Sequence, residues 1–285
     1  MTINLLIANS RKCDIENTND NIDKFLKVFP DSKIFIFHDN TDLAECNYHE
    51  KATVLTLNKN IGLLYGRKYL VEHIPEKYDN ELFCWLDSDD HIIPEKLQEL
   101  KDFYDKNPDY EIIGSLDHIS IWGLAIALKI FKYVYSYFPE NPYGFRLHYY
   151  EDHIFLQVLK ELIRTKKLDV KIFKCYIPFI DYTGYHNTDY SIPKNMQLFF
   201  EGLFVQYLWS KETQWDIHIP YITFNGQMSY FYRVYGVEKV NNILLPLLNR
   251  LNKYKPEILK ILKSEEERGT FLKELIEKQK EKLKK

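Results

Sequence analysis

The sequence predicts an α/β protein, with a mostly parallel sheet flanked by helices and a helical region after it. Over residues 1–115, short apolar stretches of strand character alternate with stretches whose apolar residues recur at helical spacing. From about Pro193 onwards the pattern is mainly helical. The chain has 285 residues, of which 45% are hydrophobic and 28% charged; this excludes a disordered chain and suffices for a buried core.

The predicted strands of the first part are short, apolar and bounded by polar or turn residues: Asn4–Ala8, Lys33–Phe37, Ala52–Leu57, Glu81–Leu86 and Glu111–Ile113. The helices predicted between them are Ile22–Phe29, Leu63–His73 and a helix that begins at Pro94. Pro30 and Pro75 end the first two helices, and Pro94 occupies the first position that proline favours in the third. Strands connected through helices are expected to pair in parallel.

After residue 116 the alternation becomes less regular. Ile154–Ile163 has the spacing of an amphipathic helix, Val170–Ile177 that of a strand, and Pro256–Lys285 that of a long charged helix. Glutamates partly balance the lysines of this last helix. That favours a solvated helix packed on the domain, with a membrane-surface or partner-binding helix as the alternative. We expect two domains, residues 1–190 and a helical extension of residues 191–285.

Composition and charge argue against several classes of protein. The formal net charge is −3, whereas nucleic-acid-binding domains usually carry a basic excess. No stretch reaches the roughly 18 apolar residues of a membrane span, and no basic region of a signal peptide precedes the first apolar run. The cysteines lie far apart without a Cys-x-x-Cys pair, which argues against a cysteine zinc site and favours reduced thiols. We expect a cytoplasmic protein.

Polar and acidic residues gather where three predicted strands end: Asn9-Ser10-Arg11, Asp39-Asn40-Thr41-Asp42 and Asp87-Ser88-Asp89-Asp90. In open α/β sheets, ligands bind beyond the carboxyl ends of the strands. The third cluster has three carboxylates within four residues, and their repulsion costs free energy unless a cation or a satisfied turn offsets it. Oxygen ligands of this kind suit Mg²⁺ or Mn²⁺. The alternative is an Asp-rich turn that caps the helix beginning at Pro94.

Four segments, in the same order, resemble family 2 glycosyltransferases of the GT-A fold. They are Ile34–Asp42, similar to the family's second strand and acidic turn; Asn60-Ile61-Gly62 with Arg67, similar to its Asn-x-Gly and arginine; Leu86–Leu97, similar to its Asp-x-Asp segment; and Tyr149–Phe155, similar to its Glu-Asp at a helix start. The resemblance covers roughly residues 2–190. The end of the first strand, Ala8-Asn9-Ser10-Arg11, departs from the family pattern.

The resemblance implies a GT-A catalytic domain, a Rossmann-like nucleotide-diphospho-sugar transferase fold, over residues 1–190. It implies an inverting transfer, of hexosyltransferase type, from a UDP-sugar to an acceptor hydroxyl, with Mn²⁺ or Mg²⁺. The residues implied are Asn9, Asp39, Asn60, Arg67, Asp87 and Ser88 for the nucleotide; Asp89, Asp87 and His186 for the metal; and Asp152 as general base, with Glu151 as the competing choice.

Three of these roles have a structural alternative. Arg67 is alternatively a surface arginine, and His186 a polar loop histidine. An acidic residue in a first helical turn is also favoured by the helix dipole alone, which is the alternative for Asp152.

The resemblance leaves the acceptor open among a glycan, a lipid-linked glycan, a protein and a modified nucleic-acid base. Residues 191–285 would complete the acceptor side or dock a partner, and the C-terminal helix is the candidate for peripheral membrane contact.

Two other functions remain, a nucleotidyltransferase and a non-catalytic relative. A nucleotidyltransferase would normally carry a Gly-rich phosphate loop where this chain has Asn9-Ser10-Arg11-Lys12. The second is a non-catalytic relative that binds sugar nucleotides.

Overall fold

A computed structural model of the chain describes residues 2–9, 14–39, 46–57, 59–116, 123–138, 144–145, 151–175, 177–181, 191–211 and 222–283. The chain divides into two compact units. The first consists of Met1–Glu140 and Tyr150–Asn187, and the second of Asn141–Tyr149 and Thr188–Lys285.

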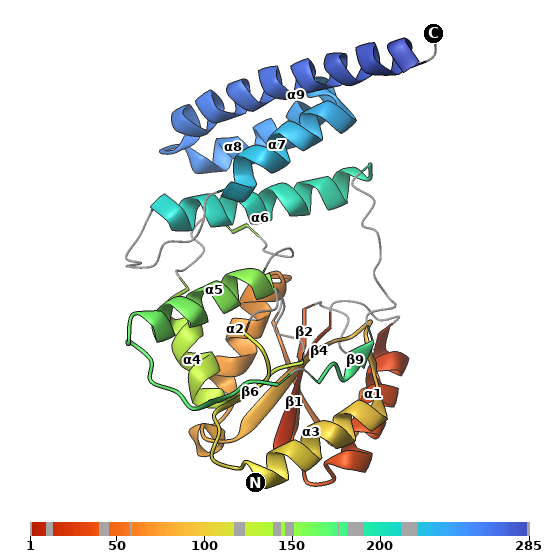
Figure 1. The fold of residues 1–285 in the computed structure, drawn as a ribbon, viewed down its shortest axis with the longest axis vertical. Helices are drawn as coiled ribbons and strands as arrows, with labels where there is room; N and C mark the ends of the chain where they lie inside the picture. Colours follow the sequence, from red (N-terminus) through yellow and green to blue (C-terminus); the bar gives the residue numbers. More distant parts are fainter. Residues whose placement is uncertain are drawn as a thin grey trace. The chain divides into compact units, whose positions relative to one another are not determined.

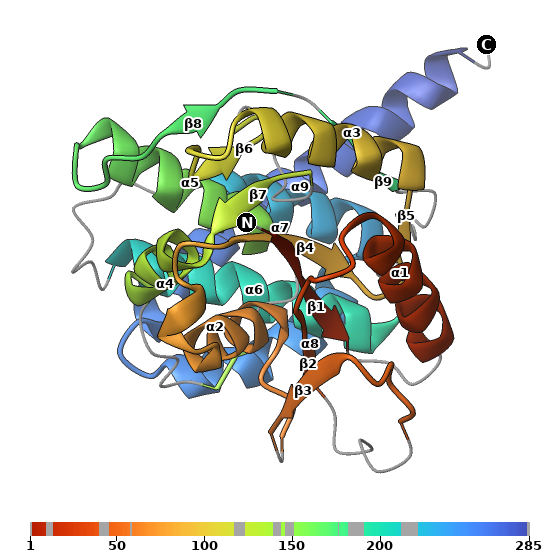
Figure 2. The same ribbon diagram turned by 90° about the horizontal axis from the view of Figure 1, so that it is seen from below.

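The first unit contains a seven-stranded sheet with the strand order β3-β2-β1-β4-β7-β6-β8. Figure 1 labels the strands β1, β2, β4 and β6 of this sheet, and Figure 2 labels all seven. The strands are β1 (Ile3–Asn9), β2 (Ile34–His38), β3 (Ala52–Thr56), β4 (Leu82–Asp87), β6 (Ile112–Ile113), β7 (Ala125–Ala127) and β8 (Ile172–Phe173). The first four pair in parallel, and β7 runs antiparallel to its neighbours β4 and β6. The predicted fold class, a mostly parallel sheet with a helical C-terminal region, is confirmed.

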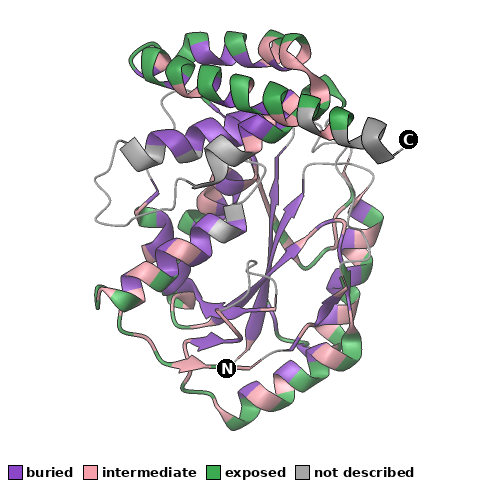
Figure 3. Cartoon of the chain, turned by 45° about the horizontal axis from the view of Figure 1, so that its top comes forward, coloured by how far each residue is buried: buried purple, intermediate pink, exposed green. Residues whose placement is uncertain are grey.

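Helices cover both faces of this sheet, as predicted (Figure 2). One face carries α1 (Ile15–Val28) and α3 (Pro94–Lys106); the other carries α2 (Leu63–His73), α4 (Leu128–Ser136) and α5 (Glu151–Arg164). Because both faces are covered, every residue of β1 and β2 is buried, as the purple central strands show (Figure 3). A short 3₁₀ helix, η3 (Glu76–Tyr78), precedes β4, and a separate two-stranded sheet pairs β5 (His91–Ile92) with β9 (Ile180–Asp181).

Two helices begin earlier than the apolar spacing predicts. Helix α1 starts at Ile15 instead of Ile22. Its first turns are rich in asparagine, which has low helix propensity, and they lack apolar residues at helical spacing, so the sequence gives no signal for them. Helix α5 starts at Glu151 instead of Ile154, so the Glu-Asp pair forms part of its first turn. In both cases the additional residues are mainly polar.

The region after residue 116 differs more from the prediction. The strand predicted over Val170–Ile177 is limited to the two residues of β8. Strand β7 and helix α4 lie in a stretch for which the sequence predicts no element. Apolar and aromatic residues fill that stretch, and a short buried run of this kind has no periodicity that separates a strand from a helix.

The second unit is helical, with α6 (Pro193–Lys211), α7 (Ile222–Tyr235), α8 (Val237–Leu248), the 3₁₀ helix η4 (Asn249–Leu251) and α9 (Lys255–Leu283). Helices α7 and α9 pack closely, since a Cβ atom on Gly269 would lie 2.8 Å from the Ser229 carbonyl oxygen. The last helix is thus packed on its unit through a buried stripe that includes Ile258 and Leu262. Within the described ranges, no helix has the length and apolar character needed to span a membrane.

Candidate active site

One described residue from each of the three predicted polar clusters, Asn9, Asp39 and Asp87, lies at one edge of the sheet, while residues 10, 11 and 40–42 of these clusters lie outside the described part of the chain. From β1 the chain moves outward to β2 and β3, and then returns to place β4 on the other side of β1. The strand order therefore reverses between β1 and β4, and ligands of open α/β sheets bind outside the carboxyl ends of the strands at such a point. Asn9 ends β1, Asp39 follows β2 and Asp87 ends β4, with Ala8 in register with Asp87.

Arg67 joins two of the predicted site carboxylates. Its side chain is only 1% exposed, so the alternative of a surface arginine is wrong. Nη2 donates to Asp87 Oδ1 at 2.6 Å, and Nη1 donates to Asp152 Oδ1. The guanidinium carbon lies 5.1 Å from the centre of the Trp85 ring, which is a cation–π distance. Residues from α2, the end of β4 and the first turn of α5 are therefore in direct contact. We call Arg67, Asp87 and Asp152 the ion-pair cluster.

The start of α2 is fixed by the end of β2. Both carboxylate oxygens of Asp39 accept backbone N–H groups, from Ile61 at 2.9 Å and from Gly62 at 3.1 Å, and the Asn60 amide donates to the Asp39 carbonyl at 2.9 Å. A carboxylate at this position also stabilises the positive end of the helix dipole. Gly62 has a φ of +83°, a conformation that favours glycine. Asp39 and Asn60 thus hold the turn that leads to Arg67, and their contacts with a nucleotide stay a prediction.

Close packing of α2 on β2 also brings Arg67 into place. A Cβ atom at Gly66 would lie 2.4 Å from the Phe37 ring, so only glycine allows the helix to approach the strand this closely. The guanidinium is thereby buried between two carboxylates. Burial raises the pKa of Asp87 above its ordinary value; the charge of Arg67 opposes this shift and that of Asp152 adds to it. Two carboxylates share one guanidinium, so the cluster has an excess of negative charge.

The acidic turn, residues 88–90, follows directly after Asp87. Asp90 is buried, and burial, followed by the charges of Asp87 and Asp89, raises its pKa to about 8. Its Oδ2 atom has no hydrogen-bond partner within the described part of the chain. The turn does not cap α3, because the N-cap residue of that helix is Ile93 and no side-chain cap bond is made. The capping alternative for this cluster is therefore wrong.

The chemistry of the acidic turn fits a hard divalent cation only in part. Asp87, Asp89 and Asp90 supply oxygen ligands, and the buried, unbonded Oδ2 of Asp90 is a polar atom that a cation would satisfy. Over the described ranges, however, no three His, Cys, Asp or Glu side chains come together as a complete metal cage. Mg²⁺ is usually held by one or two carboxylates, with waters and substrate phosphates completing its shell. A cation shared with a substrate would need only one or two of these carboxylates.

Three residues near this edge, Tyr48, Asn17 and Asn21, are not among the site residues that the sequence predicts. Tyr48 Oη accepts the Asn9 amide at 2.8 Å and lies 2.6 Å from His38 Nδ1, so it links the ends of β1 and β2. Asn17 and Asn21 of α1 bond the backbone of the acidic turn. The cluster of asparagines at the start of α1 is the signal in the sequence, but nothing in it indicates their partners.

The remaining predicted site residues are placed as follows. Ser88 is buried, and its Oγ donates to Asp14 Oδ2 at 3.2 Å. Asp89 is half-buried in the acidic turn. Glu151 is the first residue of α5, but its side chain lies outside the described part of the structure, as does all of His186.

No protein-family model and no curated protein matches the sequence. Among solved structures, the chain is similar to the crystal structure of S. aureus TarS 1–349, with 12% identity, a TM-score of 0.47, and coverage of 98% of this chain and 92% of that chain. For the complex of TarS 1–349 with UDP, the values are 14%, 0.46, 94% and 90%.

A third similar structure is that of Rv0371C from Mycobacterium tuberculosis H37Rv in complex with manganese. It has 11% identity and a TM-score of 0.35, and the alignment covers 62% of this chain and 89% of that chain. At these identities and TM-scores, the three similarities assign no function to this chain. A function has to be argued from the residues of the site.

Proposed function

We propose that this chain is an inverting glycosyltransferase that moves a sugar from a UDP-sugar to an acceptor hydroxyl and depends on Mn²⁺ or Mg²⁺. The contact of Arg67 with both Asp87 and Asp152 carries the proposal. These residues come from three of the segments that resemble family 2 glycosyltransferases, and they are up to 85 residues apart in the sequence. Their meeting at the carboxyl edge of the sheet is what a shared active site requires.

In the proposed reaction, Asp152 is the general base. Its carboxylate accepts the proton of the acceptor hydroxyl while the hydroxyl oxygen attacks the anomeric carbon, and UDP leaves from the opposite face, so one displacement inverts the configuration. Arg67 holds Asp152 and Asp87 in a fixed relation, which positions the base relative to the end of β4. Asp152 stands at the start of a helix whose apolar face, with Phe155 and Leu159, is buried, so the base is mounted on a rigid element.

The donor nucleotide is proposed to bind beside β1, β2 and β4. Asp89 and Asp87 would hold the divalent cation, with His186 as a further proposed ligand; the bound cation would offset the charge of the departing diphosphate. Asn9, Asp39, Asn60, Arg67 and Ser88 are the proposed contacts with the nucleotide. The helical residues 191–285 are proposed to complete the acceptor side or to dock a partner.

The test is release of free UDP from separate UDP-sugars in the presence of Mn²⁺. The proposed function predicts release that requires the cation. A nucleotidyltransferase would release no UDP from a UDP-sugar, because its diphosphate comes from UTP when UTP reacts with a sugar phosphate. A non-catalytic relative would bind the UDP-sugar without releasing UDP. Either result would contradict the proposal.

Asp89→Ala tests the cation site within the same experiment. We expect loss of Mn²⁺-dependent UDP binding with the fold retained, because the substitution removes repulsion from the acidic turn. The matched control is Asp109→Ala, which removes an exposed carboxylate from another turn of the first unit and should leave Mn²⁺ dependence unchanged. Unchanged Mn²⁺ dependence in Asp89→Ala would remove Asp89 from the site.

A further inference from the structure

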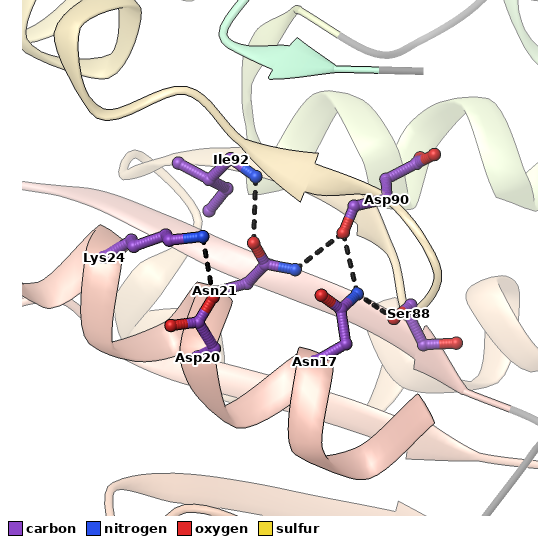
Figure 4. Close-up of polar contacts among 7 residues, drawn as sticks. All are labelled: Asn17, Asp20, Asn21, Lys24, Ser88, Asp90 and Ile92. Atoms are coloured by element: carbon purple, nitrogen blue, oxygen red, sulfur yellow. Dashed lines mark hydrogen bonds and ion pairs between the residues drawn. The ribbon is translucent and has the colours of Figure 1, made fainter. Parts of the chain in front are cut away.

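Two asparagines of α1 hold the backbone of the acidic turn (Figure 4). The Asn17 side-chain amide donates to the Ser88 carbonyl at 2.7 Å and to the Asp90 carbonyl at 2.9 Å. The Asn21 amide donates to the same Asp90 carbonyl at 2.7 Å, and its Oδ1 accepts the Ile92 N–H at 2.8 Å. Asn17 and Asn21 are four residues apart, so they lie on one face of the helix.

The clamped residues lie between two segments that are anchored in other ways. Before the turn, β4 is paired in the main sheet; after it, His91 and Ile92 are paired with β9. Within the turn, the backbone bond from the Asp90 N–H to the Asp87 carbonyl is long, at 3.2 Å. The two asparagines therefore fix residues 88–90, which lie between the two paired strands and belong to neither sheet.

The groups that hold the acidic turn, the side-chain amides of Asn17 and Asn21, are neutral, although several carboxylates lie nearby. Neutral amides bond the backbone carbonyls, and the Asp90 carboxylate points away from both of them (Figure 4). The asparagines therefore set the path of the turn without neutralising its carboxylates. A lysine or arginine in their place would compete with a cation for those oxygens, whereas an amide leaves their charge in place.

We propose that Asn17 and Asn21 are positioning residues for the divalent cation. They hold the backbone of Asp87–Asp90, so that the carboxylates of this segment reach the metal in a fixed geometry. This inference rests on the proposed function, because it needs the cation site. Partners that orient metal ligands typically contribute 10–100-fold to metal affinity.

Asn19 provides a matched control on the same helix. Its amide donates to the Asn47 carbonyl at 2.9 Å, and its Oδ1 accepts the His49 N–H at 2.8 Å. Asn19 thus bonds one backbone carbonyl and one backbone N–H, as Asn21 does, but in a loop outside the acidic turn. Substituting Asn19 removes the same chemical group and a similar number of bonds from the same helix.

The experiment measures the dissociation constant for Mn²⁺ at saturating UDP, by calorimetry corrected for Mn²⁺ bound to free UDP, together with the thermal midpoint of unfolding. We expect Asn17→Ala to weaken Mn²⁺ binding about tenfold, and Asn21→Ala by up to about 100-fold. Asn19→Ala should lower the thermal midpoint about as much as Asn17→Ala but leave the Mn²⁺ constant unchanged. Asn21 is fully buried, and if its variant does not fold, the half-buried Asn17 decides.

The outcomes separate this inference from the proposed function. If the unsubstituted protein binds UDP with Mn²⁺, but Asn17→Ala shifts the Mn²⁺ constant no more than Asn19→Ala does, the positioning role is overturned and the glycosyltransferase proposal stands. If the unsubstituted protein shows no Mn²⁺-dependent UDP binding, both are overturned.

Discussion

The ion-pair cluster and the acidic turn begin at the same strand end, but their charges are compensated in different ways. In the ion-pair cluster, the carboxylates of Asp87 and Asp152 both accept N–H groups from the buried Arg67 guanidinium. In the acidic turn, the bonds from Asn17 and Asn21 reach the backbone, and the buried Oδ2 of Asp90 has no hydrogen-bond partner in the described part of the chain.

The difference separates two functions of acidic residues at one site. A carboxylate paired with a buried arginine is fixed in place, and losing its partner would leave a buried charge uncompensated. The acidic turn is instead held through its backbone, and the pKa of Asp90 there is raised by burial and by the charges of Asp87 and Asp89. On this comparison, the buried arginine holds the two carboxylates of the ion-pair cluster in place, whereas the bonds from Asn17 and Asn21 hold only the backbone of the acidic turn.

The largest effect is expected from Asp152→Asn, within the ion-pair cluster. The amide keeps the shape and an oxygen that can accept from Arg67, but it cannot take up a proton. Turnover with a UDP-sugar should fall by about 10²–10⁴-fold while UDP and Mn²⁺ affinities stay close to normal. The measurement is initial UDP release beside UDP affinity. Glu151→Gln is the control, and if that variant is the inactive one, the base is assigned to the wrong residue.

Arg67→Met should produce the next largest effect, on stability. It leaves the carboxylates of Asp87 and Asp152 without their guanidinium, and breaking a buried pair costs about 3–5 kcal/mol of the free energy of unfolding. Urea unfolding measures this loss. The control, Lys101→Met, breaks the surface pair with Asp105 and should cost only about 0.3–0.5 kcal/mol. Equal losses in the two variants would contradict the distinction drawn here.

The same Arg67 variant tests the predicted nucleotide contact. A charge-assisted hydrogen bond contributes about 1.5–3 kcal/mol, so losing a contact with UDP would weaken its affinity measurably. If UDP affinity is unchanged while stability falls, Arg67 acts only through the two carboxylates.

The smallest effect concerns the acidic turn and its dependence on pH. The raised pKa of Asp90, about 8, means that the folded state binds this proton more tightly than the unfolded chain does. Stability should therefore fall as pH rises from about 4, the ordinary pKa of an aspartate, to about 8. Asp90→Asn removes this contribution, so at pH 8 the variant should be more stable than the unsubstituted protein by about 1–3 kcal/mol, with little difference near pH 4.

Urea unfolding across this pH range, in a buffer with a chelator of divalent cations, measures the effect. Asp109→Asn, at an exposed position, is the control and should follow the unsubstituted protein. A pH slope that Asp90→Asn leaves unchanged would show that the buried carboxylate does not limit stability.

The fold class and the edge of the sheet that carries the candidate site follow from local patterns in the sequence. The strands that end at Asn9 and Asp87 are buried on both faces, so their apolar residues are continuous over Leu5–Ala8 and Leu82–Leu86, and the polar residues that follow mark the strand ends. Helix α2 begins and ends as predicted, because its apolar spacing and the proline after it are local signals. Patterns of this kind depend only on neighbours in the chain.

Which of these residues are in contact depends on how the elements pack. Arg67 has the same local signal whether it faces solvent or lies between Asp87 and Asp152, and its burial follows from the close approach of α2 to β2 at Gly66. Asn17 and Asn21 break the apolar periodicity of α1, so the sequence predicts no helix there, yet their amides bond backbone groups about 70 residues away. Such contacts depend on how separate elements pack, and neither spacing nor composition records that packing.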